Sequence, residues 1–230
     1  MPISSRDTIL SSLRAARRPF PNAAPRPDAY IAVTMQDATD PDALLERFSR
    51  ELAGLTGEVF PVLGDAAACA KVIELIQSHH APRILAWDFR HIPVQGLESA
   101  LREASVQVLC PDTQDEFRAE TLALAETAKV GLTGADAAVA TTATLVVTTG
   151  PGKGRLPTIL PPVHIAVITL DQIVARLEDW VALQRAAGLA SIRRAGNFCF
   201  ISGPSRTGDI EMQLVLGVHG PGRVQVVVKR

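Results

Sequence analysis

A glycine-rich stretch with two cations has the composition of an anion-binding loop. It reads Gly150-Pro151-Gly152-Lys153-Gly154-Arg155 and lies between two apolar runs, 145–147 and 165–168. Closely spaced glycines allow backbone N–H groups to approach a ligand, and Lys153 and Arg155 supply positive charge. Because loops at the carboxyl ends of strands bind ligands in α/β sheets, the pattern predicts a site for a carboxylate or a phosphate. The alternative is a surface turn with two solvated cations.

Gly150, Gly152 and Gly154 do not form a nucleotide-binding fingerprint. The spacing GxxxxGK[ST] is absent, and Gly154 occupies the position at which serine or threonine would bind magnesium. The even spacing of the three glycines also differs from GxGxxG. The sequence therefore lacks a conventional kinase or dinucleotide fingerprint.

A second stretch repeats the combination of glycine, hydroxyl groups and a cation. It reads Ser202-Gly203-Pro204-Ser205-Arg206-Thr207-Gly208-Asp209 and follows the apolar run 198–201, for which we predict a strand buried on both faces. A helix is expected to begin near Thr207 to Asp209, and its free N–H groups would favour an anion by about 0.3–1 kcal/mol. A charge-assisted hydrogen bond from Arg206 is worth about 1.5–3 kcal/mol, so Arg206 would dominate this site.

The second stretch also has a purely structural interpretation, in which its hydroxyl groups cap the helix and Asp209 pairs with Arg206. We favour ligand binding because both stretches follow apolar runs and contain Gly-Pro beside a cation. If their strands are near neighbours in a parallel sheet, both loops leave the same edge and converge on one anion site. The ligand-binding candidates here are Ser202, Gly203, Ser205, Arg206, Thr207 and Asp209.

Candidates for proton transfer are Asp136, His164 and His219. Asp136 follows Thr133-Gly134, and we count all three as ligand-binding candidates, although helix capping is the commoner role of such an aspartate. The unperturbed pKa of histidine lies near neutrality, which suits proton transfer, whereas many histidines only donate structural hydrogen bonds. No Ser-His-Asp arrangement can be identified from the sequence.

Charge and cysteine content exclude several classes of protein. The chain has 230 residues with 23 Lys and Arg against 24 Asp and Glu, and a nucleic-acid binder would be more basic. No apolar run reaches the roughly 20 residues of a membrane helix, and no signal peptide is visible. Cys69, Cys110 and Cys199 are far apart and form no CxxC pair, so no metal site and no iron–sulfur ligation are predicted. We expect a reduced, cytoplasmic protein.

Helical and strand periodicities alternate along the chain, which is typical of βαβ units and a largely parallel sheet. A helix at 5–16 and a proline-rich segment at 19–27 come first, and we expect this arm to pack on its own domain or on a second subunit of a homodimer. We therefore divide the chain into an arm, 1–27, and one α/β domain, 28–230. Expected helices cover 41–55 (capped by Asp40), 65–79, 97–104, 113–128 and a stripe at 170–181 that includes Trp180. Expected strands cover 59–63, 84–87, 106–110, 214–218 and 224–228, besides the apolar runs named above.

Three strings of the sequence resemble the lactate-utilisation protein C family, also called the LUD-domain family. They are GLTGADAAVA, GPGKGRLPTILPPVHIAV and SGPSRTGDIEMQLVLGVHGP. The resemblance covers essentially the whole chain and implies an open α/β fold similar to the sugar-phosphate isomerase and CoA-transferase group. It also implies a role in oxidising L-lactate to pyruvate beside two partners, one of which carries iron–sulfur clusters. We expect no intrinsic cofactor here and place those clusters on a partner only.

One position departs from the family pattern. Where the family usually has an acid, then threonine or serine, then glycine, this chain has Thr141-Thr142-Ala143. The missing carboxylate at Thr141 removes a potential metal or proton-transfer ligand. An activity that depends on this carboxylate is therefore not expected here, and a changed substrate is one alternative.

The function we infer at this point is that of a subunit of cytoplasmic L-lactate oxidation with a small-anion pocket. One alternative is a free-standing enzyme of the cyclo-ligase or CoA-transferase kind, acting on a phosphorylated or acyl substrate. Another is a non-catalytic module that senses a carboxylate.

Overall fold

The computed structural model describes residues 5–16, 39–110, 118–208 and 214–230, and the chain divides into two compact units, 1–36 and 37–230. In the first unit the predicted N-terminal helix is present as α1 (Ser5–Ala16). The predicted domain boundary after residue 27 lies outside the described residues and stays a prediction.

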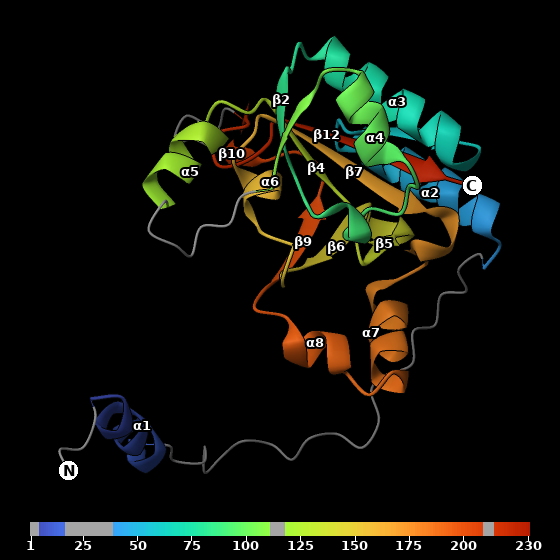
Figure 1. The fold of residues 1–230 in the computed structure, drawn as a ribbon. Coiled ribbons are helices and arrows are strands. Elements are labelled where there is room, and N and C mark those ends of the chain that lie inside the picture. The colour runs from blue at the N-terminus through green and yellow to red at the C-terminus, as the bar shows by residue number, and fades with distance from the viewer. Residues whose placement is uncertain (1–4, 17–38, 111–117, 209–213) are drawn as a thin grey trace. The chain divides into compact units, whose positions relative to one another are not determined.

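The second unit is organised around six parallel strands (Figure 1). Their order across the sheet is β1 (Glu58–Val62), β12 (Arg223–Lys229), β7 (Val163–Thr169), β4 (Val130–Thr133), β2 (Arg83–Ala86) and β3 (Gln107–Leu109). Every neighbouring pair is parallel. Strands β4 and β7 are buried along nearly their whole length, as continuous apolar runs in a covered parallel sheet must be. The predicted open, mostly parallel α/β sheet is confirmed.

Helices cover both faces of this sheet. Successive side chains of β2 point to opposite faces and contact different helices. Ile84 and Ala86 belong to the large core that includes α3 (Gly64–Ser78) and α4 (Leu97–Glu103). Leu85 points the other way and packs with residues of α5 (Arg118–Ala125) and α6 (Leu156–Ile159). The predicted helices at these places are confirmed, except that 113–117 lie outside the described residues.

Helix α2 (Pro41–Gly54) begins where the sequence predicts. The Asp40 side chain accepts a hydrogen bond of 2.9 Å from the Ala43 N–H, and Pro41 occupies the first helical position. The stripe that it buries consists of Leu44, Leu45, Phe48 and Leu52. Among the described helices none is long and apolar enough to cross a membrane.

A second, four-stranded sheet has the order β8 (Ile173–Val174), β5 (Ala137–Val139), β6 (Thr144–Thr148) and β9 (Phe198–Ser202). Strand β6 is antiparallel to both β5 and β9. The continuous helical stripe predicted for 170–181 is wrong in its first half, because a short turn and β8 precede helix α7 (Leu177–Ala186). The side chain of Gln172 holds that turn by bonding the Thr169 N–H and the Ala135 carbonyl. Trp180 is buried in the core beneath this sheet, as predicted.

Two local predictions near the C-terminus are wrong. Strand β9 is not buried on both faces: it is an edge strand, and Phe200 is 49% exposed. The helix expected near Thr207 does not begin there, because β10 (Arg206–Gly208) pairs with β11 (Leu214–Leu216) as an antiparallel hairpin. β-Branched and apolar residues in β11 give β10 a partner, and that pairing uses the backbone groups a helix would need. Asp209 lies outside the described residues.

Candidate functional site

The carboxyl ends of three neighbouring parallel strands bring together side chains that are far apart in the sequence. Asp88 lies two residues beyond β2, Cys110 directly follows β3, and Asp136 lies beyond β4. The glycine-rich loop after β6 lies at the same edge, since Asp88 donates its backbone N–H to the Gly152 carbonyl at 2.9 Å. This edge is where open α/β sheets bind ligands.

Lys153 is held inside the protein. Its Nζ lies 2.6 Å from Asp136 Oδ1 and 2.9 Å from Thr148 Oγ1, and it sits 4.9 Å from the centroid of the Trp87 ring. The Lys153 side chain is only 13% exposed. One of the two cations expected to meet a ligand therefore fixes the loop to β6 and to the residue that precedes β5 instead.

Both oxygens of the Asp136 carboxylate have hydrogen-bond partners. Besides Lys153, its carboxylate accepts the Thr148 N–H at 2.6 Å and the Thr148 hydroxyl at 2.9 Å. These contacts make Asp136 the anchor of the loop, and they leave its candidate role in proton transfer untested.

The loop rests on the segment that follows β2. Trp87 Nε1 donates to the Gly154 carbonyl at 2.8 Å, and His91 Nε2 lies 3.1 Å from the Pro151 carbonyl. Gly152 has a left-handed φ of 75°, and a Cβ there would lie 2.8 Å from the Asp88 Cβ. Glycine is thus required at 152 by backbone conformation and by close approach.

A cavity of about 800 Å³, which we call the arginine cavity, opens between this loop and the strand ends. Arg155 and Arg194 line it, and neither makes an ion pair or a side-chain hydrogen bond within the described part of the chain. The backbone N–H groups of Gly152 and Gly154 likewise meet no acceptor among the described residues. The full lining is Ala86, Asp88, Cys110, Thr149, Gly150, Pro151, Gly152, Lys153, Gly154, Arg155, Pro157, Arg194 and Gly196.

Arg194 reaches the cavity because helix α8 (Ala190–Arg194) ends just before β9. Gly196 and Thr149 connect this helix end to the loop, since the Gly196 N–H donates to the Thr149 carbonyl at 3.2 Å. The volume lies within the roughly 300–1,000 Å³ of small-molecule sites. Unpaired guanidinium groups and free amides are donors suited to a carboxylate or a phosphate.

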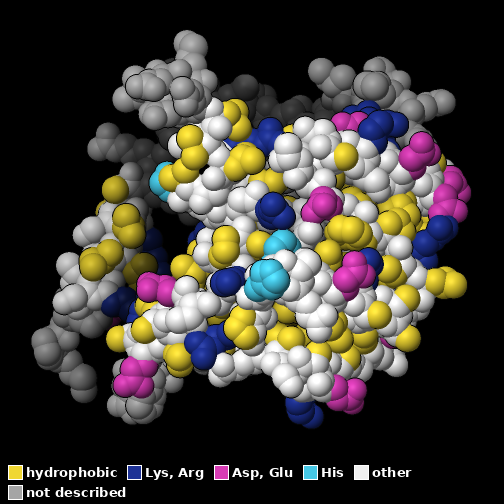
Figure 2. Space-filling model, turned by 90° about the horizontal axis from the view of Figure 1, so that it is seen from above, with side chains coloured by type: hydrophobic (Ala, Val, Ile, Leu, Met, Phe, Trp, Pro, Cys, Tyr) yellow, Lys and Arg dark blue, Asp and Glu magenta, His cyan; other side chains and the backbone are white. Residues whose placement is uncertain are grey.

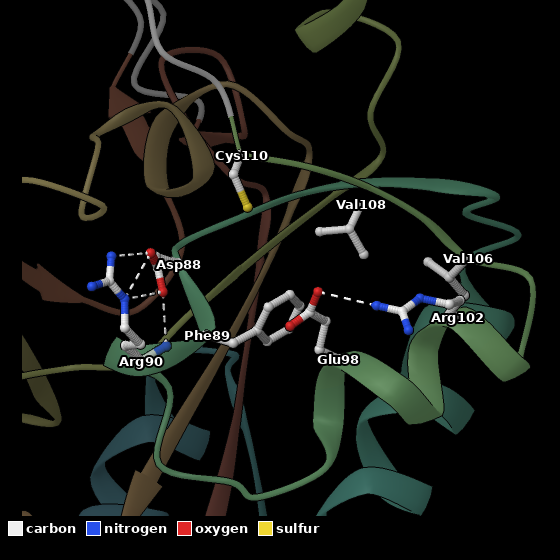
Figure 3. Close-up of a pocket in the computed structure, with 8 residues that line it drawn as sticks. All are labelled: Asp88, Phe89, Arg90, Glu98, Arg102, Val106, Val108 and Cys110. Carbon is white, nitrogen blue, oxygen red and sulfur yellow. Dashed lines mark hydrogen bonds and ion pairs between the residues drawn. The ribbon is translucent and has the colours of Figure 1, made fainter.

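A second cavity of about 610 Å³, the valine cavity, adjoins the first and shares Asp88 and Cys110 with it (Figure 3). Arg90 binds the Asp88 carboxylate through two nitrogens, which holds the pKa of Asp88 well below its usual range. Burial, followed by the nearby carboxylates of Asp88 and Glu98, raises the pKa of the Cys110 thiol. Cys110 is therefore a neutral thiol at physiological pH. The remaining lining residues are Phe89, Arg102, Val106 and Val108.

His164 lies within the main sheet and lines neither cavity. It is completely buried on β7, its Nε2 lies 2.8 Å from Thr133 Oγ1, and its Nδ1 has no partner among the described residues. Burial lowers the pKa of His164 to about 4, so the ring is neutral near pH 7. His219 is an exposed residue of the turn before β12. Gly134 packs so closely that a Cβ would lie 2.2 Å from the His91 carbonyl oxygen.

The predicted convergence of the two glycine-containing loops is wrong. In the antiparallel register of β6 and β9, Thr148 lies opposite Phe198 and Thr144 lies opposite Ser202. The Gly150 loop and the Ser202 loop therefore leave opposite ends of the pair. Ser205 donates its N–H to the Pro221 carbonyl, which ties the second loop to the start of β12, at the amino edge of the main sheet.

Arg206 contacts the end of a helix. Its guanidinium donates to the Leu55 carbonyl at the C-terminus of α2 and lies 3.4 Å from Thr56 Oγ1. A cation suits this end because the last carbonyls of a helix lack partners. Gly203 has a φ of 74°, and its Cβ would lie 2.8 Å from the Leu55 Cβ, so this loop also packs against α2. The pairing with Asp209 falls outside the described residues, and ligand binding by Ser202, Ser205 and Thr207 stays a prediction.

The position that departs from the family pattern lies close to this second loop. Thr142 Oγ1, Thr144 Oγ1 and Ser202 Oγ form a chain with steps of 2.7 Å. Ala143 has a φ of 46° and is fully buried. Glycine adopts a left-handed backbone at less cost than alanine, which explains why the family usually has glycine at position 143. Within the described residues no cluster of three histidine, cysteine or acidic side chains could hold a metal ion.

Four residues of the site are not predicted from the sequence: Trp87, Asp88, Cys110 and Arg194. Asp88 and Cys110 each follow a predicted strand, so the rule that ligands bind beyond strand ends could have indicated them. Arg194 carries no such signal, because its position depends on how α8 packs.

Fold and site together define an open α/β protein with a polar cavity at the carboxyl edge of its parallel sheet. The model of the LUD domain matches residues 45–228, and the chain belongs to the LUD-domain family, as the sequence resemblance predicted.

Curated relatives agree with this assignment, and a solved structure has a similar fold. The chain is 36% identical over 156 residues to lactate utilization protein C of Shouchella clausii and 39% identical over 160 residues to that of Exiguobacterium sp.. Each alignment covers 67% of this chain and 66% and 64%, respectively, of the relatives, so the match spans just under two thirds of their length. A crystal structure of a DUF162 family protein from Deinococcus radiodurans has a TM-score of 0.58 at 19% identity, covering 84% of this chain and all of that one, which shows a shared fold.

Proposed function

We propose that this protein binds a small organic anion in the arginine cavity and serves as a cytoplasmic subunit of an L-lactate utilisation system. The family and the names of the relatives support the choice of system. The observation that carries the anion site is the pair of guanidinium groups, Arg155 and Arg194, that line one cavity without an acidic partner in the described residues. Both side chains are exposed and solvated in the free protein, and an anion that enters the cavity can accept charge-assisted hydrogen bonds from them.

Oxidation of L-lactate to pyruvate releases two electrons and two protons, so the proposal requires an acceptor. The resemblance implies partner proteins with iron–sulfur clusters, which are the class of group that would accept those electrons. Co-purification of the full chain with such a protein supports this arrangement. We also propose that the chain forms a homodimer, and light scattering of the full chain measures its oligomeric state.

Charge on the surface fits a small-molecule ligand better than nucleic acid. On the face seen in Figure 2, cationic and anionic side chains are interspersed, with no extended field of one sign. Together with 23 basic and 24 acidic residues, this favours a local anion site over a long basic surface.

Isothermal titration of the full chain with L-lactate, pyruvate and phosphate tests the site. Replacing Arg155 or Arg194 by alanine should weaken binding of the preferred anion about ten- to a hundred-fold, because one charged hydrogen bond of about 1.5–3 kcal/mol is lost. Arg193→Ala is the matched control, since it removes the neighbouring exposed arginine that does not line the cavity. Equal binding by all four proteins would overturn the proposed site.

One observation favours the free-standing enzyme as a second candidate. The valine cavity adds a further volume of about 610 Å³, which a three-carbon acid leaves empty. Turnover of a phosphorylated or acyl substrate by the isolated chain would favour this candidate.

A further inference from the structure

The arginine cavity and the valine cavity meet at Asp88 and Cys110, which line both. These two residues lie beyond β2 and β3, which pair directly in the parallel sheet. The shared wall is therefore set by neighbouring strand ends of a hydrogen-bonded sheet. A ligand that extends past these side chains contacts both cavities.

Charge is distributed differently in the two cavities. Arg90 is paired with Asp88 and Arg102 with Glu98, so each cation of the valine cavity has its own carboxylate. Arg155 and Arg194 in the arginine cavity have no such partner within the described residues. An anionic group is therefore favoured in the arginine cavity and gains little in the valine cavity.

The wall of the valine cavity offers apolar contact. Phe89, Val106 and Val108 are half-buried and line it. Figure 3 shows Phe89 between the Asp88–Arg90 pair and Glu98, and Val108 above the Glu98–Arg102 pair in this view. Partly exposed apolar side chains that line a hollow gain free energy when a ligand removes them from water.

We infer that the two cavities form one site for an amphipathic anion, whose carboxylate or phosphate lies in the arginine cavity and whose apolar part lies in the valine cavity. This inference rests on the proposed anion site and adds the class of ligand. It distinguishes an aromatic or acyl-bearing acid from lactate itself, which has no large apolar part to place in the valine cavity.

Matched pairs of probes test the inference. Isothermal titration of the full chain would compare L-lactate with L-3-phenyllactate and methyl phosphate with phenyl phosphate. Within a pair the anionic group is the same, so the ratio of affinities measures the apolar part alone. Partial burial of the ring should make the aromatic member of the preferred pair bind about ten-fold more tightly.

Filling the valine cavity should remove this advantage. In Val108→Phe the new ring occupies the apolar wall, so the affinity ratio should fall towards one while lactate or methyl phosphate binds as before. Val106→Phe repeats the test from the other end of the wall, in case Val108→Phe does not fold. Val215→Phe is the control, because Val215 is an exposed valine of β11 and lines neither cavity.

The outcomes separate this inference from the proposed function. Equal affinity for both members of each pair in the wild type, with binding lost in Arg194→Ala, keeps the anion site and overturns the amphipathic ligand. An aromatic preference that survives in both filled variants also overturns it, because the ring then binds elsewhere. Absence of binding by every probe overturns the proposed function and this inference with it.

Discussion

At the scale of single residues, the protein uses several of its polar groups to hold itself together. Lys153 and Asp136, two candidate ligands, are bonded to each other, and Arg206 caps α2. The groups left available at the arginine cavity are Arg155, Arg194 and loop amides. Only the surroundings of a charged side chain distinguish a ligand-binding group from a structural one.

Asp136→Asn should lower the free energy of unfolding by about 1–3 kcal/mol, because Lys153 would keep its charge in a largely buried position without a counter-ion. Urea unfolding followed by circular dichroism measures the change. Glu98→Gln is the control, since its ion pair with Arg102 is well exposed and should contribute less than about 1 kcal/mol. An equal loss in both variants would contradict a special role for Lys153.

The stability of the protein should depend on pH through His164. Its pKa is about 4 in the folded state and near 6.5 in the unfolded chain, so only the unfolded chain binds the proton between these values. Above pH 6.5 the titration of His164 does not change the free energy of unfolding. As pH falls from 6.5 to 4, this free energy decreases by at most about 3 kcal/mol.

Urea midpoints measured between pH 4 and pH 8 test this dependence. His164→Gln should flatten the pH profile in this window, although the variant itself is less stable because the site is tightly packed. His219→Gln should keep the wild-type profile, since His219 is exposed. A wild-type slope retained in His164→Gln would show that other groups cause it.

At the scale of elements, loops that look alike in sequence have different structural roles. The Gly150 loop packs on the segment after β2, and the Ser202 loop packs on the end of α2. Each needs a glycine with positive φ where it approaches its support. Substitutions in each loop would separate these two roles.

Gly152→Ala should destabilise the glycine-rich loop by more than about 1 kcal/mol, because a Cβ would contact Asp88 and the backbone is left-handed. Gly154→Ala is the matched control two residues away, where nothing lies within 4 Å of an added Cβ. Thermal unfolding, together with anion titration, would detect the difference. Similar behaviour of both variants would contradict the packing described here.

Arg206→Ala should cost about 0.5–1 kcal/mol of stability, because the C-terminus of α2 loses its cation. Anion affinity should stay unchanged if the ligand binds at the opposite edge of the sheet. A titration with phosphate and L-lactate measures the affinity, and a ten-fold loss would place the ligand at the second loop.

At the scale of the whole molecule, the hydrophobic core belongs to the α/β unit and not to the N-terminal arm. The chain clusters into units 1–36 and 37–230, and the large core lies entirely in the second. Helix α1 buries none of its residues. The second unit therefore has the core that independent folding requires.

Deleting residues 1–27 should leave the α/β unit folded, with an urea midpoint close to that of the full chain. Circular dichroism and size-exclusion chromatography of the truncated chain measure this. Complete loss of folded protein would show that the arm belongs to the core or to an obligate dimer.

Local sequence patterns are enough to predict the fold class, the family and most elements. Periodicity and caps are local, so Asp40 identifies the start of α2, and apolar runs identify β4, β6 and β7. Local patterns also located the glycine-rich loop at one edge of the sheet. They failed at β9 and β10, where the state of the chain depends on a neighbouring strand rather than on its own residues.

Which chemical groups meet depends on long-range packing. The antiparallel pairing of β6 with β9 separates two loops that a parallel arrangement would have joined, and strand direction is set by long-range packing rather than by residue type. The same packing joins Asp88, Cys110, Arg155 and Arg194, which come from four distant segments, around one cavity. A charged side chain is free for a ligand only when no partner reaches it first, and distance in space settles that, not distance in sequence.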